Sequence, residues 1–150
     1  MRSFSSLMRF VSVLIISLLP TSDNWQAKAT ADLPKNNPPH MLYQVEDQIK
    51  MAESLFADIR PGLEKSIIWA GKPHHRTRYS IVYIHGFSAS KEELRPVPDI
   101  VAASLGANIY YTRLTGHGRT AEAMLEASVS AWLKDLAEAF EIGTMIGDKV

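Results

Sequence analysis

The sequence contains no cysteine among its 150 residues. This absence excludes disulfide bonds, thiolate metal ligands and a cysteine nucleophile. An excess of charge of either sign is also lacking, because 16 Lys and Arg residues balance 16 Asp and Glu residues. The balance gives no electrostatic reason to expect a nucleic-acid partner. The chain is nevertheless 46% hydrophobic, which is enough to build the core of one ordinary domain.

One long apolar run lies near the N-terminus, at residues 10–19, and the basic residues Arg2 and Arg9 precede it. The run has about half of the ~20 residues that a membrane-spanning helix needs. Residues 27–29 (Ala-Lys-Ala) then supply a small-residue cleavage pattern. These features predict a signal peptide at residues 1–29 and export to the periplasm or the cell exterior, with no stable membrane span after cleavage. An uncleaved anchor or a buried strand is the alternative.

Residues 30–42 are rich in proline and asparagine, which is typical of a linker, so a folded domain is predicted over residues 43–150. Apolar residues recur every three or four positions from Val45 to Ile59, and this spacing predicts a helix. Its acidic residues, Glu53 among them, are expected on the solvated side.

Short apolar runs bounded by turn residues predict the strands of a sheet. The connection 71–78 is too short for a parallel crossover, so the first two strands are antiparallel if they pair. The connections 86–107 and 115–147 each contain a helical pattern and suit parallel crossovers. We therefore predict an α/β fold with a mostly parallel sheet, one antiparallel strand near its start, and helices on both faces. The predicted strands are residues 66–70, 79–85, 108–114 and a fourth that begins at Asp148.

Two short motifs follow predicted strands. The first is His85-Gly86-Phe87-Ser88, directly after the second strand. A loop that leaves a strand end can present a backbone N–H to the oxyanion of an acyl-transfer reaction, and Gly86 leaves the approach free of a side chain. A plain strand-to-helix turn that happens to contain a glycine is the alternative.

The second motif, Gly116-His117-Gly118, follows the third predicted strand. We expect His117 to pack within a structural turn, because a lone histidine lacks the partners that catalytic triads require. In this order, the two motifs resemble those of the α/β-hydrolase family of serine hydrolases, in particular its lipase, esterase and serine-aminopeptidase-like branches. The resemblance covers about residues 63–150. Arg119 stands near the position where the family often has serine.

The resemblance implies the N-terminal half of an α/β-hydrolase sheet and a serine hydrolase that acts on a small ester or lipid-like substrate. It assigns one oxyanion hydrogen bond to the backbone N–H of Phe87, in a loop formed with His85, Gly86 and Ser88. The implied reaction passes through an acyl-enzyme and needs neither a cofactor nor a metal ion.

The family continues with a strand that leads into Gly-x-Ser-x-Gly, followed later by the acid and the histidine of the triad. No Gly-x-Ser-x-Gly occurs in this sequence. We therefore expect an N-terminal fragment that ends before the nucleophile, contains no catalytic residue and is inactive alone.

Two alternatives stay open. Residues 86–90 match the nucleophile motif except at Ser90, so Ser88 could be a nucleophile, although His117 is the only later histidine. The chain could also be a non-catalytic short homologue that acts as a binding or interaction protein.

Overall fold

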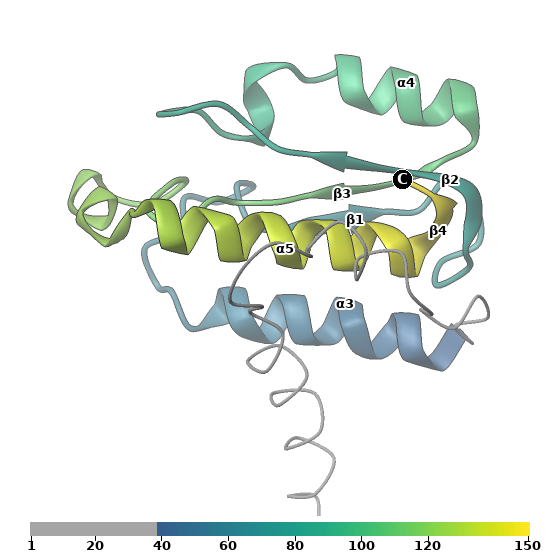
Figure 1. Ribbon diagram of the computed structural model, residues 1–150, viewed down its shortest axis with the longest axis horizontal. Coiled ribbons are helices and arrows are strands. Elements are labelled where there is room, and N and C mark those ends of the chain that lie inside the picture. Colours follow the sequence, from purple (N-terminus) through teal and green to yellow (C-terminus); the bar gives the residue numbers. More distant parts are fainter. Residues whose placement is uncertain (1–38) are drawn as a thin grey trace, which may run out of the picture. The chain divides into compact units, whose positions relative to one another are not determined.

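The computed structural model describes residues 39–150, which are coloured in Figure 1. The predicted signal peptide (1–29) and residues 30–38 of the predicted linker lie outside the described residues. The described elements are α3 (Pro39–Ser54), β1 (Ser66–Ile68), β2 (Thr77–Tyr83), η1 (Lys91–Glu93), α4 (Val97–Leu105), β3 (Asn108–Tyr111), η2 (Ala121–Glu126), α5 (Val129–Ile146) and β4 (Gly147–Lys149), where η denotes a short 3-10 helix.

Helix α3 begins inside the predicted linker. It begins at Pro39, so residues 39–42 are helical, and Leu42 is fully buried. Proline is tolerated in a first helical turn because the N–H that it lacks would have no helical acceptor there. The boundary predicted after residue 42 from proline and asparagine content is therefore too late. None of the helices in residues 39–150 has the length and apolarity that a membrane span requires.

The described strands form a sheet in the order β1-β3-β2-β4. Strand β2 runs parallel to both of its neighbours, pairing Tyr83 with Tyr111 of β3 and Thr77 with Gly147 of β4. Strand β1 is antiparallel to β3. The predicted α/β class is thus confirmed, with a mostly parallel sheet and one antiparallel strand near its start. The first two strands do not pair with each other, because β3 lies between them.

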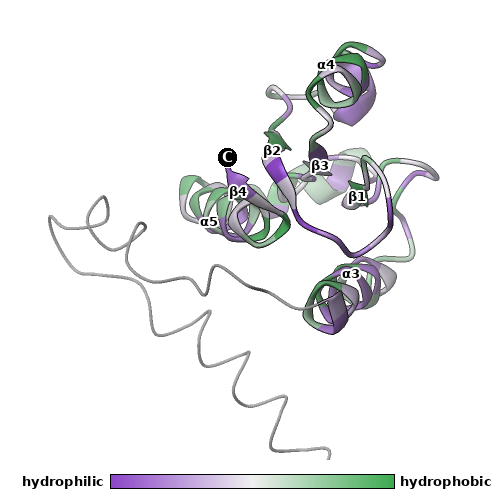
Figure 2. Ribbon diagram, turned by 90° about the vertical axis from the view of Figure 1, so that its right-hand side faces the viewer, coloured by the Kyte–Doolittle hydropathy of each residue, from purple (hydrophilic) through white to green (hydrophobic). Residues whose placement is uncertain are grey.

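Helices cover both faces of this sheet (Figures 1 and 2). The crossover from β2 to β3 and the crossover from β3 back past β2 to β4 run in opposite directions. Crossovers of the same hand that run in opposite directions place their helices on opposite faces. Helix α4 accordingly lies on one side of the strands, and α5 lies with α3 on the other (Figure 1).

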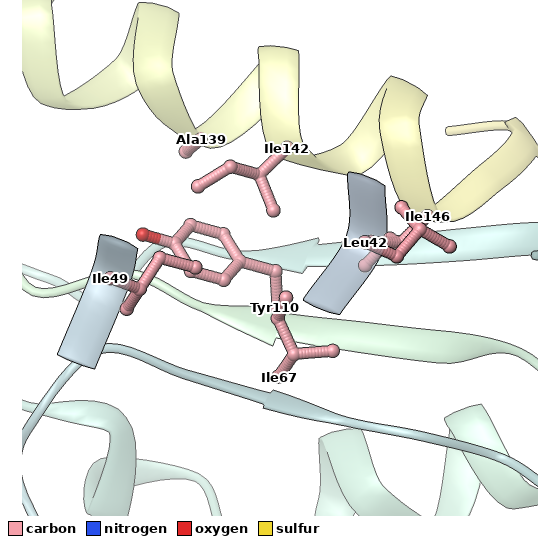
Figure 3. Close-up of a cluster of buried hydrophobic side chains, with 7 residues drawn as sticks. All are labelled: Leu42, Ile49, Ile67, Tyr110, Ala139, Ile142 and Ile146. Carbon is pink, nitrogen blue, oxygen red and sulfur yellow. The ribbon is translucent and has the colours of Figure 1, made fainter. Parts of the chain in front are cut away.

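Successive residues of β3 fill the two resulting cores, as side-chain alternation along a strand requires. Tyr110 is fully buried among residues of α3 and α5 (Figure 3). Ile109 and Tyr111 point to the other face, where they pack with Ala102 of α4. Every residue of β3 is buried, which is expected for a strand that is covered on both faces.

Two residues hold the junction of α5 and β4 in place. The Arg76 guanidinium donates to the carbonyl oxygens of Thr144 and Met145, at 2.8 and 2.6 Å. A cation at a helix C-terminus satisfies free carbonyls and complements the helix dipole. Gly147 then ends the helix and begins β4, which confirms the strand start predicted next to Asp148 within one residue.

We expect Gly147→Ala to weaken the pairing of β4 with β2. A methyl group at this position would lie 2.6 Å from the backbone nitrogen of Ser80, so the two strands would have to separate. The expected loss is about 1–3 kcal/mol in the free energy of unfolding, measured by urea denaturation. Gly71→Ala is the matched control, because a methyl group there meets no atom within 4 Å. Equal effects of the two substitutions would contradict the close approach of β4 to β2.

Candidate functional site

The candidate site lies at the edge of the sheet where β2 and β3 end. These strands are parallel, so both carboxyl ends reach the same edge, at the left in Figure 1. The first loop, residues 84–90, leaves β2, and the second loop, residues 112–120, leaves β3. Thr112 N–H continues the ladder by donating to the carbonyl oxygen of Tyr83 at 3.2 Å. The two sequence motifs therefore start side by side.

Two histidines join these loops reciprocally. His85 of the first loop accepts the Leu114 N–H of the second loop at its Nε2 atom, at 3.1 Å. His117 of the second loop accepts the Ser88 N–H of the first loop at its Nε2 atom, at 3.0 Å. Both rings are almost fully buried, and their centroids lie 4.9 Å apart. We call this pair of hydrogen bonds the histidine brace.

The hydrogen bonds define the tautomer of each ring. Since Nε2 accepts, a neutral ring must carry its proton on Nδ1. That Nδ1–H can donate to the Gly86 carbonyl oxygen from His85, at 3.0 Å, and to the Thr115 carbonyl oxygen from His117, at 3.2 Å. Burial lowers the pKa of His85 below its ordinary value of 6.5, which favours the neutral ring that the brace requires.

The first loop contains a tight turn over residues 86–89, closed by the Ala89 N–H donating to the Gly86 carbonyl oxygen at 3.2 Å. Ser88, the third residue of the turn, has φ = 61°, a sign that type II turns require at this position. The N–H of Phe87, the second residue, has no hydrogen-bond partner among the described residues. The predicted oxyanion donor thus lies at a sheet end and outside the backbone ladder.

The Phe87 ring is 75% exposed, although its edge contacts two aromatic side chains. Its centroid is 6.0 Å from that of His117 and 6.0 Å from that of Trp132, both in edge-to-face geometry. Such contacts add to the burial of apolar area. This side of the site therefore presents an apolar, aromatic surface to whatever approaches the turn.

The predicted turn glycines differ in how strongly the chain requires them. Gly116 has φ = 85° and Gly118 has φ = 68°, and added methyl groups would lie 3.0 Å from the Ala123 carbonyl oxygen and 2.9 Å from Arg113 Cδ. Only glycine suits both the backbone and the space at these positions. A methyl group at Gly86 would meet nothing closer than 3.5 Å, so packing within the described residues does not require a glycine there.

A buried ion pair that the sequence analysis missed supports the second loop. Arg113 donates from two guanidinium nitrogens to the two Glu53 carboxylate oxygens, each at 2.8 Å, and from its third nitrogen to the His117 carbonyl oxygen at 3.1 Å. The expectation that Glu53 is solvated is wrong, since both side chains are only 6% exposed. Glu53 follows Leu42 and Ile49 on the buried face of α3, and this spacing was the available signal.

Burial and hydrogen bonding act in opposite directions on Glu53. Burial alone would raise the pKa of its carboxyl, but hydrogen bonds from Arg113 and from the Lys65 N–H outweigh it, so the pKa is lowered. The carboxylate therefore stays charged and keeps Arg113 in place.

Helix α5 also holds the second loop. Asp135 accepts the Thr115 N–H at 2.6 Å, and the Trp132 indole N–H donates to the Thr115 carbonyl oxygen at 3.0 Å. Ser128 caps the same end of α5 by accepting the Ala131 N–H at 3.1 Å. The loop is thus attached to both α3 and α5.

The geometry gives Ser88 no base. Both ring nitrogens of His85 and of His117 are engaged with backbone groups, and the Ser88 hydroxyl has no hydrogen bond to any described residue. A serine nucleophile needs a nitrogen acceptor within hydrogen-bond reach. Over residues 39–150, no cluster of three or more His, Asp and Glu side chains is placed to hold a metal ion.

Comparisons of the chain with protein-family models, with curated proteins and with solved structures gave no match.

We expect Glu53→Gln to lower the free energy of unfolding by about 3 kcal/mol, because it leaves Arg113 buried without a counter-charge. Glu92→Gln, which removes the exposed partner of Arg95, is the control and should cost less than about 1 kcal/mol.

The pH dependence gives a second readout of the same pair. Since the pKa of Glu53 is lowered, its stabilisation is present above 4.5, the ordinary carboxyl value, and is lost as the pH falls through the lower folded value. Urea denaturation at several pH values should show a larger acid-dependent loss in the native chain than in Glu53→Gln, because the other carboxyls with lowered pKa values remain in both. An unchanged profile would argue against the ion pair.

Proposed function

We propose that residues 39–150 form the oxyanion-loop half of an exported serine hydrolase of the α/β-hydrolase type, with carboxylic esters as its substrates. The observation that carries the proposal is the N–H of Phe87. It lies in a tight turn at the carboxyl end of β2 and makes no hydrogen bond to any described residue. Donors of this kind stabilise the negative charge that develops on a carbonyl oxygen during acyl transfer.

The position of β4 supports this proposal. In the family that the two motifs resemble, the strand that pairs with the first motif's strand leads into the nucleophile. Here β4 lies beside β2 and parallel to it. Lys149 of β4 pairs with Tyr79, so a strand that continues β4 in this register, about 4.8 Å from β2, would reach the same edge as the turn over residues 86–89. A serine in that position would lie within reach of a carbonyl bound at Phe87.

The role of this chain's own residues is electrostatic and steric. As the serine oxygen adds to the ester carbonyl, the carbonyl oxygen becomes negative and accepts the Phe87 N–H. Gly86 leaves room for that approach, and the exposed Phe87 ring contacts an uncharged part of the substrate. Loss of one such donor typically slows the reaction about 10²–10³-fold. An apolar surface and a neutral histidine pair favour a small ester or lipid-like substrate over a charged one.

We expect the purified 150-residue chain to lack esterase activity, because Ser88 has no base among the described residues. The measurement is hydrolysis of a short-chain nitrophenyl ester, compared with buffer and with a mock purification from the same host. A rate above both backgrounds that disappears in Ser88→Ala would overturn the assignment and make Ser88 the nucleophile.

The decisive variant is Phe87→Pro, made in a polypeptide that joins this chain to a nucleophile-bearing segment from the same reading frame. Proline removes the N–H yet is favoured at the second position of type I and type II turns, so the loop geometry is retained. We expect kcat to fall about 10²–10³-fold with little change in KM. Phe87→Ala is the control, because it keeps the N–H and removes only the ring. Equal kcat values for the two variants would rule out the Phe87 amide as the oxyanion donor.

The second candidate function is that of a binding or interaction protein. Apolar residues on the surfaces of two helices favour it, one helix on each face of the described sheet (Figure 1). Such surfaces mark contacts with another polypeptide. Sequencing the reading frame past codon 150 separates the two functions: a following Gly-x-Ser-x-Gly favours the hydrolase, and an immediate stop codon favours the binding protein. The exposed residues are Val97, Ile100 and Leu105 of α4 and Val129, Leu133 and Phe140 of α5.

A further inference from the structure

We propose that His85 and His117 are proton-sensitive positioning residues, which hold the turn over residues 86–89 when neutral and release it when protonated. The inference rests on the proposed function in one respect: that function is what makes the direction of the Phe87 N–H matter. The brace itself is a property of the described chain and can be tested without catalysis.

The argument begins with the direction of the two hydrogen bonds. Each Nε2 atom accepts a backbone N–H, from Leu114 in one case and from Ser88 in the other. A protonated imidazole carries hydrogen on both nitrogens and has no acceptor left. After protonation, the Nε2–H group of the ring and the backbone N–H would face each other at a buried position, and both are donors. The hydrogen bond must break, and the amide must move to find another acceptor.

The turn depends on the bond from Ser88 for its conformation. Ser88 has φ = 61°, a region that non-glycine residues occupy only when their surroundings hold them there. Its N–H is fixed by His117, and the Gly86 carbonyl oxygen is fixed by both His85 and Ala89. If the brace opens, Ser88 loses this support and relaxes to negative φ. The Phe87 N–H, which lies between these two anchors, then changes direction.

Several charged groups face the histidine pair. Arg113, beside the His117 carbonyl oxygen, is neutralised by Glu53 of α3. Glu93 of η1 lies 3.4 Å from the Gly86 nitrogen, and Asp135 of α5 binds the Thr115 N–H next to His117. These last two carboxylates leave negative charge beside the brace, and that of Glu93 favours a proton on His85.

The other contacts of the rings oppose that proton. Both rings are almost fully buried, and a centroid distance of 4.9 Å makes two positive charges unfavourable together. Burial lowers the pKa of His85, so its half of the brace, the bond from Leu114, is present above 6.5 and is lost as the pH falls through the lower folded value. The His85 half of the brace thus opens below pH 6.5.

The experiment is NMR on the full 150-residue chain labelled with ¹⁵N. Through-hydrogen-bond couplings between the Ser88 nitrogen and His117 Nε2, and between the Leu114 nitrogen and His85 Nε2, report the brace directly. We expect both couplings at about pH 8 and their stepwise loss on acidification below the ordinary histidine value, because two adjacent positive rings are unfavourable. Hydrogen exchange at residues 86–89 should accelerate up to about tenfold over the same range, beyond the chemical effect of pH, while Tyr110 of β3 stays protected.

Two variants at His117 distinguish a role in positioning the turn from a role in filling space. His117→Gln supplies a side-chain oxygen that can accept the Ser88 N–H but does not titrate, so protection of residues 86–89 should persist without the acid-dependent loss. His117→Phe fills the space without an acceptor, so protection should be low over the whole pH range. His75→Gln, at an exposed histidine outside the site, is the control and should behave like the native chain.

The outcomes are distinct. Couplings that are absent at about pH 8, or that persist on acidification until Tyr110 itself loses protection, would overturn the inference. If His117→Phe fails to fold, the native pH series and His117→Gln still decide. A failure of Phe87→Pro to slow catalysis would remove the proposed function and leave the brace intact.

Discussion

A buried backbone N–H needs an acceptor, and at the carboxyl edge of this sheet two histidine rings supply acceptors that the strands no longer can. The ladder between β2 and β3 ends where Thr112 N–H donates to the Tyr83 carbonyl oxygen. Beyond this bond, the His85 and His117 rings each accept a hydrogen bond from a backbone N–H of the opposite loop. These two hydrogen bonds fix the positions of the loops and the tautomers of both rings. They also hold the backbone of Ser88 in its strained conformation.

The same edge is connected to the core through charged and aromatic groups. Arg113 joins the His117 carbonyl oxygen to Glu53 of α3, and Asp135 with Trp132 joins Thr115 to α5. Both helices pack on one face of the sheet, against the cluster centred on Tyr110 (Figure 3). A buried network of this kind is stable only when every member is satisfied, so a change at α3 affects the loops after β2 and β3.

Local patterns in the sequence predicted the helices and strands well, but they predicted the long-range contacts between these elements poorly. Apolar runs and connection lengths gave all four described strands and the parallel crossovers, because these depend on nearby residues. The first three strands were predicted to end too late, at residues 70, 85 and 114, and residues 112–114 after the third are buried like the strand itself. The pairing of β1 with β3 and the Glu53–Arg113 ion pair were not foreseen, because partners about 40 to 60 positions apart leave no periodic signal. His117 was expected to be structural, but its bond to Ser88 depends on the register of β2 against β3.

Stability alone does not account for the first loop. The N–H groups of Gly86, Ser88 and Ala89 all have partners, whereas that of Phe87, in the middle of the turn, has none among the described residues. Gly86 is not required by packing, and Ser88 keeps an unfavourable positive φ. A loop selected only for folding would place a side chain at Gly86 and a glycine at Ser88. A free amide beside a glycine that packing does not require supports the proposal that this turn binds a carbonyl oxygen.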